Sequence, residues 1–340
     1  MARQLPMRAD LIEYQHAVAG HEGTLCDVDG ELFIKPCTPA EIAFYESSIA
    51  SHPQFAEYIS TYLGTLTLDE TQNVATIEEA GAALIAKHSI PEVVVPSKAR
   101  TTKKIATNQA IVLENAAHGF VKPNILDVKL GVRLWADDAH PEKKTRFDKI
   151  TEETTHKELG FRIAGMRVWQ GHNAKGADID TDGFKIYDKN YGRTSISSYN
   201  VHEAFRNFIF AASAGIDEEL GKLVSQAFLA DITRILEILE AQESRMFSSS
   251  LLFVFEGDGA ALRAAMEEAS GSPATLVNSD GDGDGFSEDE DGHEDPGPKI
   301  YAVKIIDFAH AEWTPGLGPD ENSLTGVRSV VKILSQLGSE

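Results

Sequence analysis

Residues 123–131, which read PNILDVKLG, constrain the fold and chemistry of this chain more than any other segment. Asp127 and Lys129 are two residues apart, so an extended backbone points both side chains to the same face. A carboxylate and an ammonium group would then converge on one cleft, although a surface salt bridge is the alternative interpretation of such a pair.

The distribution of charge favours a small anionic ligand. The formal net charge of -22 at pH 7 argues against general binding to nucleic acid or to an anionic membrane. Residues 280–295 carry nine acidic side chains and no lysine or arginine, whereas residues 122–167 hold ten basic and eight acidic side chains. A locally basic segment in an acidic protein suits a small, negatively charged substrate.

Cysteine content and hydropathy predict where the protein resides. The chain has two cysteines, Cys26 and Cys37, so neither a disulfide framework nor a cysteine metal site is expected. The first ten residues lack the apolar stretch of a secretory signal, and no later apolar run is long enough to cross a bilayer. We therefore expect an intracellular protein without a transmembrane segment.

The first third of the chain predicts a strand-rich lobe over residues 1–116. Residues 16–36 alternate short apolar runs with the turn signals GHEG and DG. A helix is expected after Thr38, with Pro39 at its first position and Glu41 three residues after the cap. Further predicted features are strands at 61–68 and 110–114, a helix within 71–87, and an insertion or mobile loop at 91–104.

Residues 117–340 predict a larger lobe of strands and helices. A charged helix is expected near 143–159, long helices between 201 and 244, and a final helix at 323–337. Strands are predicted in FRIAGMRVW, GFKIYDK, SSLLFVFEG and KIYAVKIIDFA. A helix and an acid-rich loop at about 270–298, which we expect to be disordered, separate the last two strands. This order predicts an α+β protein of two lobes.

Lys35 and Glu41 supply a cation and a carboxylate suited to phosphoryl transfer. This chemistry needs cations around the phosphates and a metal held by carboxylates. Lys35 lies in the strand LFIKP and could reach nucleotide phosphates, although an exposed lysine at a sheet edge is the favoured alternative for this residue alone. Glu41 could pair with Lys35, or it could complete a capping box with Thr38.

Asp307 predicts a magnesium site. It follows the apolar run VKII and precedes Phe308, within the sequence IDFAH. An acidic side chain at the end of a buried strand is well placed to hold Mg²⁺, which binds through one or two carboxylates and the substrate phosphates. His310 lies three residues further on, near enough to touch an acceptor.

Three motifs together resemble those of the inositol polyphosphate kinase family. PNILDVKLG is similar to the family's Pro-x-x-x-Asp-x-Lys-x-Gly signature, FSSSLLFVFEGD to its Ser-Ser-Leu-Leu motif, and IIDFAH to its metal-binding Ile-Asp-Phe segment. The motifs occur in the family's order, and with LGFRIAGMRV the resemblance covers most of residues 35–337. The GHEG turn, the FIKP strand and the segment EKKTRFDKITEETT are most similar to fungal inositol polyphosphate multikinases.

The resemblance implies a two-lobed, protein-kinase-like fold related to ATP-grasp enzymes, with ATP bound between the lobes. It implies that Glu114 and Ala116 belong to the joint that binds adenine, and that Lys35, aimed by Glu41, contacts the ATP phosphates.

The catalytic roles that the resemblance implies fall on three residues. Asp127 would bind the ribose and border the acceptor site, Lys129 would contact the transferred or substrate phosphate, and Asp307 would ligate Mg²⁺.

A basic helix at about residues 140–160 would hold the inositol phosphate. The residues implied for this role are Lys143, Arg146, Lys149, Arg167 and His310. Asp148 departs from the family pattern, because related sequences tend to carry another base at this place in the helix.

The expected activity is transfer of phosphate from MgATP to inositol trisphosphate and tetrakisphosphate, towards the pentakisphosphate. The alternatives are another kinase of the family, either an inositol hexakisphosphate kinase or an inositol trisphosphate 3-kinase, and an inositol phosphate-binding scaffold that recruits transcription factors. Residence in nucleus and cytoplasm follows from the resemblance alone, since the pair Lys103 and Lys104 is too short for a basic localisation run. A monomer is the default expectation.

The acid-rich loop contains a competing motif. DGDGDGFSEDED fits the start of a calcium-binding loop, which makes calcium sensing an alternative class. Ser287 at position eight, Asp291 in place of glutamate at position twelve, and flanks without helical patterns argue against it. A solvated acidic tract, able to bind a basic protein or weakly bind divalent ions, is the favoured interpretation.

Overall fold

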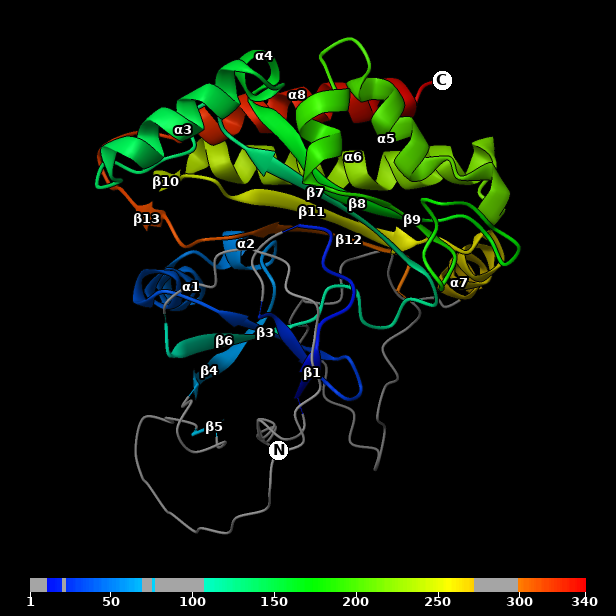
Figure 1. Ribbon diagram of the computed structural model, residues 1–340, viewed down its shortest axis with the longest axis horizontal. Helices are drawn as coiled ribbons and strands as arrows, with labels where there is room; N and C mark the ends of the chain where they lie inside the picture. Colours follow the sequence, from blue (N-terminus) through cyan, green and yellow to red (C-terminus); the bar gives the residue numbers. More distant parts are fainter. Residues whose placement is uncertain (1–10, 20–22, 69–74, 77–106, 272–298) are drawn as a thin grey trace.

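The computed structural model describes residues 11–19, 23–68, 75–76, 107–271 and 299–340 and has two lobes with a pocket between them (Figure 1). Several predicted features lie outside these residues. They are the helix within 71–87, apart from the short strand Ala75–Thr76, the loop at 91–104 and the acidic segment 280–295. No helix of the described residues is long and apolar enough to cross a membrane.

The N-terminal lobe is an antiparallel sheet in the order β1-β2-β3-β6-β4-β5. Its strands are Leu11–Glu13 (β1), Leu25–Asp27 (β2), Leu32–Pro36 (β3), Tyr62–Leu68 (β4), Ala75–Thr76 (β5) and Gln109–Glu114 (β6). Alternate residues of β3 are buried, and Leu32 and Ile34 pack against Val112 of β6. The predicted strands at 61–68 and 110–114 are therefore confirmed.

Helix α1 (Pro39–Ser51) begins where the sequence predicts. Thr38 is the N-cap, and its hydroxyl accepts a hydrogen bond from the backbone N–H of Glu41 at 3.3 Å. Pro39 supplies a fixed φ at the first position, where its missing N–H is not needed. The short helix α2 (Pro53–Ala56) follows at once.

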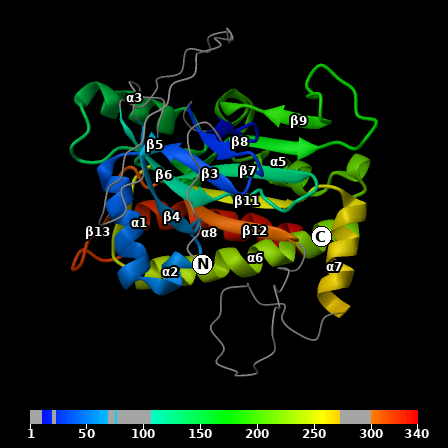
Figure 2. The same ribbon diagram turned by 90° about the horizontal axis from the view of Figure 1, so that it is seen from below.

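The C-terminal lobe is built on a second antiparallel sheet in the order β12-β11-β7-β8-β9, which Figure 2 shows from the side of the N-terminal lobe. The strands are Pro123–Leu130 (β7), Phe161–Trp169 (β8), Phe184–Tyr187 (β9), Ser250–Glu256 (β11) and Tyr301–Ile306 (β12). β10 (Ser244–Met246) and β13 (Ala311–Trp313) form a separate pair. β7 lies at the centre of the larger sheet, which explains why nearly all of its residues are buried, Asn124 and Asp127 included.

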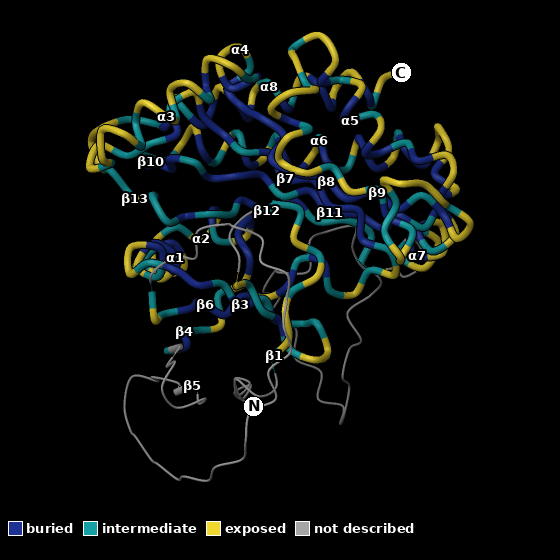
Figure 3. Tube along the Cα trace, viewed as in Figure 1, coloured by how far each residue is buried: buried dark blue, intermediate teal, exposed yellow. Residues whose placement is uncertain are grey.

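Helices cover the face of this sheet that points away from the N-terminal lobe (Figure 1). They are α5 (Val201–Ile209), α6 (Glu218–Ala241) and α8 (Glu321–Leu337), while α7 (Gly259–Gly271) lies at one end. Short π and 3₁₀ turns occupy Tyr191–Ser195 and Ala212–Ala214. On α6, Phe228, Ile232 and Ile235 recur at helical spacing and are fully buried. The buried sheet and the inner helix faces form the main core (Figure 3).

The single charged helix expected near 143–159 is wrong, because the structure divides it into α3 (Pro141–Glu152) and α4 (His156–Leu159). At the break, two threonine hydroxyls donate hydrogen bonds to nearby backbone carbonyls. Thr154 donates to the carbonyl of Ile150, and Thr155 donates to the carbonyl of Phe161 outside the helix, each at 2.7 Å. β-Branched residues with such local bonds disfavour a continuous helix.

Backbone pairing joins the two lobes at one edge of the larger sheet. Ile305 of β12 donates its N–H to the carbonyl oxygen of Tyr58 at 2.7 Å, and Ile59 forms a parallel bridge with Ile305. The segment after α2 therefore extends the sheet of the other lobe. The connection between β6 and β7, where the predicted boundary at 116/117 lies, starts beside this segment, because the backbone N–H of Glu114 donates to the carbonyl oxygen of Thr61 at 2.9 Å.

Gly326 on α8 allows that helix to pack closely, and a substitution there tests the packing. A Cβ at this position would lie 2.3 Å from the carbonyl oxygen of Gly160. Alanine favours a helix over glycine by about 1 kcal/mol, yet overpacking costs about 1–3 kcal/mol, so we expect Gly326→Ala to lower the free energy of unfolding. Urea denaturation followed by circular dichroism measures this. The exposed Lys332→Ala of the same helix is the control, and an equal or greater stability of Gly326→Ala would contradict the packing argument.

Candidate functional site

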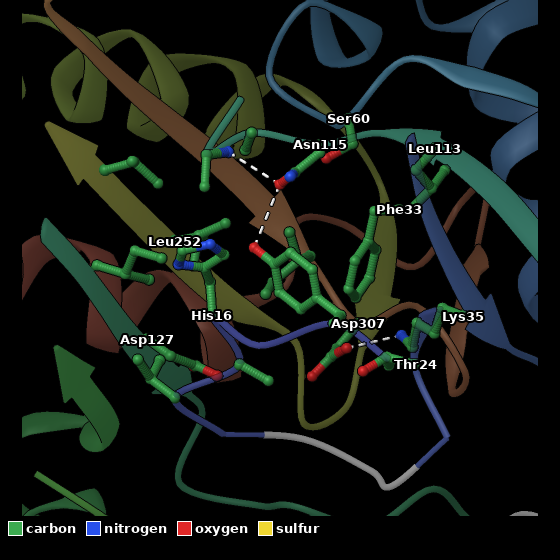
Figure 4. Close-up of a pocket in the computed structure, with 18 of the residues that line it drawn as sticks. His16, Thr24, Phe33, Lys35, Ser60, Leu113, Asn115, Asp127, Leu252 and Asp307 are labelled. Atoms are coloured by element: carbon green, nitrogen blue, oxygen red, sulfur yellow. Dashed lines mark hydrogen bonds and ion pairs between the residues drawn. The ribbon is translucent and has the colours of Figure 1, made fainter. Parts of the chain in front are cut away.

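A pocket lies between the lobes and collects side chains from distant parts of the sequence (Figure 4). β3 contributes Lys35, the link after β6 contributes Asn115 and Ala116, β7 contributes Asp127, and the turn after β12 contributes Asp307. Apolar side chains, including Phe33, Leu113, Ile125, Leu252, Val254 and Ile306, form much of the remaining wall. A cleft with an apolar wall and a few charged groups is typical of a site for a nucleotide-sized ligand.

Lys35 is held by two carboxylates. Its ammonium group lies 2.7 Å from Glu41 Oε1 and 2.7 Å from Asp307 Oδ1. Burial disfavours the charged form, but the carboxylates of Asp307 and Glu41 outweigh burial and raise the pKa of Lys35. Lys35 is therefore a largely enclosed cation on a strand with neighbours on both sides, and the alternative of an exposed edge lysine is wrong.

Glu41 serves both of its predicted roles in part. The backbone N–H of Glu41 is capped by Thr38, as in a capping box, but its carboxylate does not turn back to the helix start. Glu41 Oε1 instead accepts from Lys35 and from the backbone N–H of Phe308 at 3.2 Å. The side chain thereby fixes both the lysine and the turn that carries Asp307.

Asp307 adopts a left-handed backbone with φ of 69°. Few residues other than glycine take this conformation, although aspartate tolerates it better than most. The next residue explains why it persists, because the Phe308 ring is fully buried against Phe44 and Tyr45, with centroids 4.8 and 5.2 Å away. The anchored ring and the Glu41 bond hold the turn so that the Asp307 carboxylate points into the pocket (Figure 4).

Asp127 is a second pocket carboxylate and is largely buried, with 5% of its surface exposed. Its Oδ1 has no hydrogen-bond partner within the described part of the chain. Burial and the nearby charge of Asp307 raise the pKa of Asp127 to about 6, against the opposing effect of Lys129 and Arg162. An unpartnered buried oxygen in a cleft marks a group that a ligand can satisfy.

Lys129 does not form the salt bridge that was its alternative interpretation. Its ammonium donates to the carbonyl oxygen of Ser248 at 2.7 Å, and no ion pair in the described ranges joins it to Asp127. Lys129 is close enough to lower the pKa of both Asp127 and His310. It therefore lies between the pocket and the turn that carries His310.

Helix α3 brings one of its predicted cations to the site. Lys143 Nζ lies 3.0 Å from His310 Nε2, and burial together with Lys143 lowers the pKa of His310. Arg146 and Lys149 lie on the exposed side of α3, where Lys149 is 3.7 Å from Glu153. The structure thus joins Lys143 to His310 and leaves the other two cations facing solvent.

Arg167 lies elsewhere, on β8, and is buried. Its guanidinium stacks over the Phe184 ring at 3.8 Å and donates to His16 Nδ1 at 2.7 Å. Asp180 is 3.5 Å away. Arg167 is therefore joined to the pocket through His16, which lines it, and no hydrogen bond or ion pair among the described residues joins it to Lys143.

The link between the lobes also lines the pocket. The Glu114 carboxylate faces solvent, where it accepts a hydrogen bond from the Thr61 hydroxyl at 2.9 Å and pairs with Lys299 at 3.1 Å. Burial favours the protonated form, but these two partners hold the pKa of Glu114 below its usual range. Asn115 turns inward, donating to the carbonyl of Gly30 at 2.7 Å. Ala116 lines the pocket itself.

Two sets of residues in the site have no clear signal in the sequence. Tyr14 and His16 line the pocket, yet they precede the first recognisable turn and carry no motif. Asp148 accepts a hydrogen bond from Trp135 Nε1 at 2.6 Å, so this acid within the basic helix fastens α3 to the preceding loop. Only tertiary structure brings these pairs together.

The carboxylates fit a divalent cation that bridges to phosphates. The described residues contain no group of three or more histidines, cysteines and acids suited to hold a metal alone. Mg²⁺ needs only one or two protein carboxylates when phosphates supply other ligands. Asp307 meets that need, and a cation beside it would offset the negative charge that, together with burial, raises the pKa of Asp127.

Comparisons with known proteins agree on one family. A model of the family described as inositol polyphosphate kinase matches residues 110–335. The inositol polyphosphate multikinase of Saccharomyces cerevisiae is 31% identical over 94% of this chain and 96% of its own length, and that of Schizosaccharomyces pombe is 26% identical over 97% and 98%. Inositol hexakisphosphate kinase 1 of Mus musculus is 31% identical, but the match spans 68% of this chain and 52% of that protein.

A solved structure shares the fold. The crystal structure of the S. cerevisiae inositol phosphate multikinase in complex with ADP and Mn²⁺ superposes with a TM-score of 0.62 at 28% sequence identity. The similarity covers 90% of this chain and 99% of that one. The predicted α+β fold of two kinase-like lobes is confirmed.

The raised pKa of Asp127 predicts that this residue lowers stability in the metal-free protein. Its carboxyl is ionised in the unfolded chain above pH 4 but resists ionisation in the folded state up to about pH 6. We expect Asp127→Asn to raise the free energy of unfolding by on the order of 1 kcal/mol at pH 7.5. The gain should shrink as the pH falls through 6, where the wild-type carboxyl takes up its proton.

Urea unfolding in EDTA at several pH values measures this effect. Asp29→Asn, an exposed acid in the turn between β2 and β3, is the control and should show no such pH dependence. A loss of stability in Asp127→Asn at pH 7.5 would mean that the ionised carboxylate stabilises the fold.

Proposed function

We propose a function from one established premise: the chain belongs to the inositol polyphosphate kinase family. It is an inositol polyphosphate kinase, and we propose that it is a multikinase that uses MgATP to phosphorylate inositol trisphosphate and tetrakisphosphate, towards the pentakisphosphate. The observation that carries the proposal is the convergence of Lys35, Asp127 and Asp307 on one pocket, with Lys129 beside them and the basic helix α3 in the same lobe.

The nucleotide would occupy the pocket between the lobes. Adenine fits against the link at Glu114 and Ala116 and the apolar wall, and Asp127 can accept a hydrogen bond from a ribose hydroxyl through its unpartnered oxygen. Lys35 is aimed along β3 and restrained by Glu41, so its ammonium can contact phosphate without losing its orientation.

Transfer of the phosphate depends on charge compensation. A Mg²⁺ ion held by Asp307 neutralises negative charge on the ATP phosphates when bound. Lys129 supplies a fixed cation on the acceptor side of Asp127, where its bond to Ser248 sets its direction. Such positioning and electrostatic stabilisation account for most of the catalysis in phosphoryl transfer.

The acceptor would be recognised by cations outside the nucleotide pocket. Lys143 and His310 are already in contact, and Arg146 and Lys149 are exposed on the same helix. We place Arg167 in the same role, as a buried guanidinium that can bind phosphate in a bidentate manner. Several cations around one small ring suit an acceptor that carries three or four phosphates.

The alternatives receive less support. A non-catalytic scaffold would not need Lys35, Asp127, Lys129 and Asp307 together, and the hexakisphosphate kinases match only 68% of the chain. Binding of transcription factors by the acidic segment, residence in nucleus and cytoplasm, and a monomeric state remain proposals that follow from the family resemblance and from charge.

Asp307→Asn tests the proposed chemistry. The substitution removes a negative charge that the metal requires but preserves the shape of the side chain, so we expect turnover to fall at least about 1000-fold. Transfer of radiolabel from ATP to a panel of inositol phosphates measures it, with thermal melting as a check on folding and Asp29→Asn as the matched control. Near wild-type turnover would refute the metal assignment, and no transfer by the wild-type protein to any member of the panel would refute the kinase.

Truncation of the α3 cations tests acceptor recognition. We expect the double variant Lys143→Ala, Arg146→Ala to raise the KM for inositol trisphosphate at least about tenfold, because each phosphate contact by a charged group is worth about 1.5–3 kcal/mol. The KM for ATP should stay within about twofold. Lys332→Ala, an exposed lysine on α8, is the control. An increase confined to the KM for ATP would place these cations at the nucleotide instead.

A further inference from the structure

Residues 14–19, here named the N-terminal strap, cross the cleft and contact both lobes. In the N-terminal lobe, the Tyr14 hydroxyl donates to Asn115 Oδ1 at 3.2 Å, and its ring packs edge-on against Phe33 at 4.9 Å. Further along the strap, His16 and Val18 line the pocket (Figure 4 labels His16, Phe33 and Asn115). The strap is therefore one wall of the pocket and is fastened to the link between the lobes.

The strap runs directly over strand β8. A Cβ built on Gly165 would lie 2.0 Å from the carbonyl oxygen of Val18, so no other residue fits there without displacing the strap. Gly165 is the residue that pairs with Asp127 across β7 and β8. The strap thus covers the sheet immediately beside the catalytic carboxylate.

His16 contacts the guanidinium of Arg167 on the same strand. Arg167 NH1 lies 2.7 Å from His16 Nδ1, and because a guanidinium can only donate, Nδ1 must be the acceptor and the ring proton must be on Nε2. Burial and the charge of Arg167 lower the pKa of His16, which keeps the imidazole neutral and able to accept. The contact is therefore directional.

Arg167 is held on its other side by the loop before β9. The Phe184 ring lies under the guanidinium at 3.8 Å, and Asp180 and Asp182 lie 3.5 and 3.9 Å from NH2. These acids favour a guanidinium turned toward the loop, whereas His16 turns NH1 toward the pocket. Arg167 Nη1 also lies 3.5 Å from the carbonyl oxygen of Gln15, so both contacts that hold this nitrogen on the side of the cleft come from the strap, and the one to His16 is the shorter.

We infer that His16 is a positioning residue, which holds Arg167 toward the phosphates of the inositol phosphate acceptor, and that the N-terminal strap links this contact to the nucleotide pocket. The inference rests on the proposed function and adds a residue and a segment to it. His16 acts through Arg167 and does not itself take part in phosphate transfer.

A pair of His16 variants tests the positioning role. His16→Leu keeps a side chain of similar bulk but has no acceptor, so we expect the KM for inositol trisphosphate at saturating ATP to rise about tenfold. The kcat should change less than about threefold, and the KM for ATP should rise less than the KM for inositol trisphosphate. His16→Asn places Oδ1 near the position of Nδ1 and should recover most of the lost affinity. Loss of affinity in Leu with recovery in Asn cannot arise from a change in packing alone.

Gly165→Ala tests the contact between His16 and Arg167 in another way, by displacing the strap from β8. The added methyl group displaces the strap, so we expect the KM values for both inositol trisphosphate and ATP to rise at least about threefold, with β8 intact by thermal melting. Gly338→Ala, at the end of α8 and away from the cleft, is the matched control.

The possible failures are distinguishable. Absence of transfer by the wild-type protein would overturn the proposed function and this inference with it. Wild-type transfer with an unchanged KM in His16→Leu, or an equal loss in His16→Leu and His16→Asn, would overturn the positioning role alone. Unchanged KM values in a folded Gly165→Ala protein would overturn the link between the strap and the nucleotide pocket.

Discussion

The site depends on a buried ammonium group that requires two carboxylates from different parts of the chain. A lysine as enclosed as Lys35 would be strongly destabilising without partners. Glu41 meets this requirement only because α1 begins three residues after β3, and Asp307 meets it only because the turn after β12 takes a left-handed conformation. The ion pairs therefore tie helix α1 of one lobe to the turn after strand β12 of the other.

The same arrangement determines the electrostatics of the pocket. The single positive charge of Lys35 is shared between the carboxylates of Glu41 and Asp307. Asp127, whose Oδ1 has no hydrogen-bond partner among the described residues, lies near the second of these carboxylates. Burial and, after it, the negative charge of Asp307 raise the pKa of Asp127, so this part of the cleft holds an excess of negative charge. A metal ion would offset this excess, while the cations of α3 lie apart in the same lobe. The acidic groups are thus placed to bind a metal and its nucleotide, and the basic groups of α3 are placed apart from them to bind an anionic acceptor.

The sequence predicts the catalytic centre better than its surroundings. Lys35, Asp127 and Asp307 lie in or directly after apolar strands, where periodicity and local motifs identify both the element and the direction of the side chain. The break between α3 and α4 was missed because it depends on the Thr155 hydroxyl, which donates to the carbonyl oxygen of Phe161 beyond the helix. Contacts such as His16 with Arg167 join residues that are 151 positions apart, and no local pattern encodes them.

The catalytic centre and the groups suited to bind the acceptor differ in how firmly the fold holds them, and this difference bears on specificity for the acceptor. The catalytic carboxylates and Lys35 belong to strands and turns buried between the lobes, so a change there disturbs ion pairs on which closure of the cleft depends. The groups suited to bind the acceptor sit on α3, whose outer cations face solvent, and on Arg167, whose direction is set by a strap and a loop. Exposed helices and loops tolerate substitution at little cost in stability. Acceptor recognition can therefore vary in such a fold while the arrangement that binds and activates the nucleotide stays fixed.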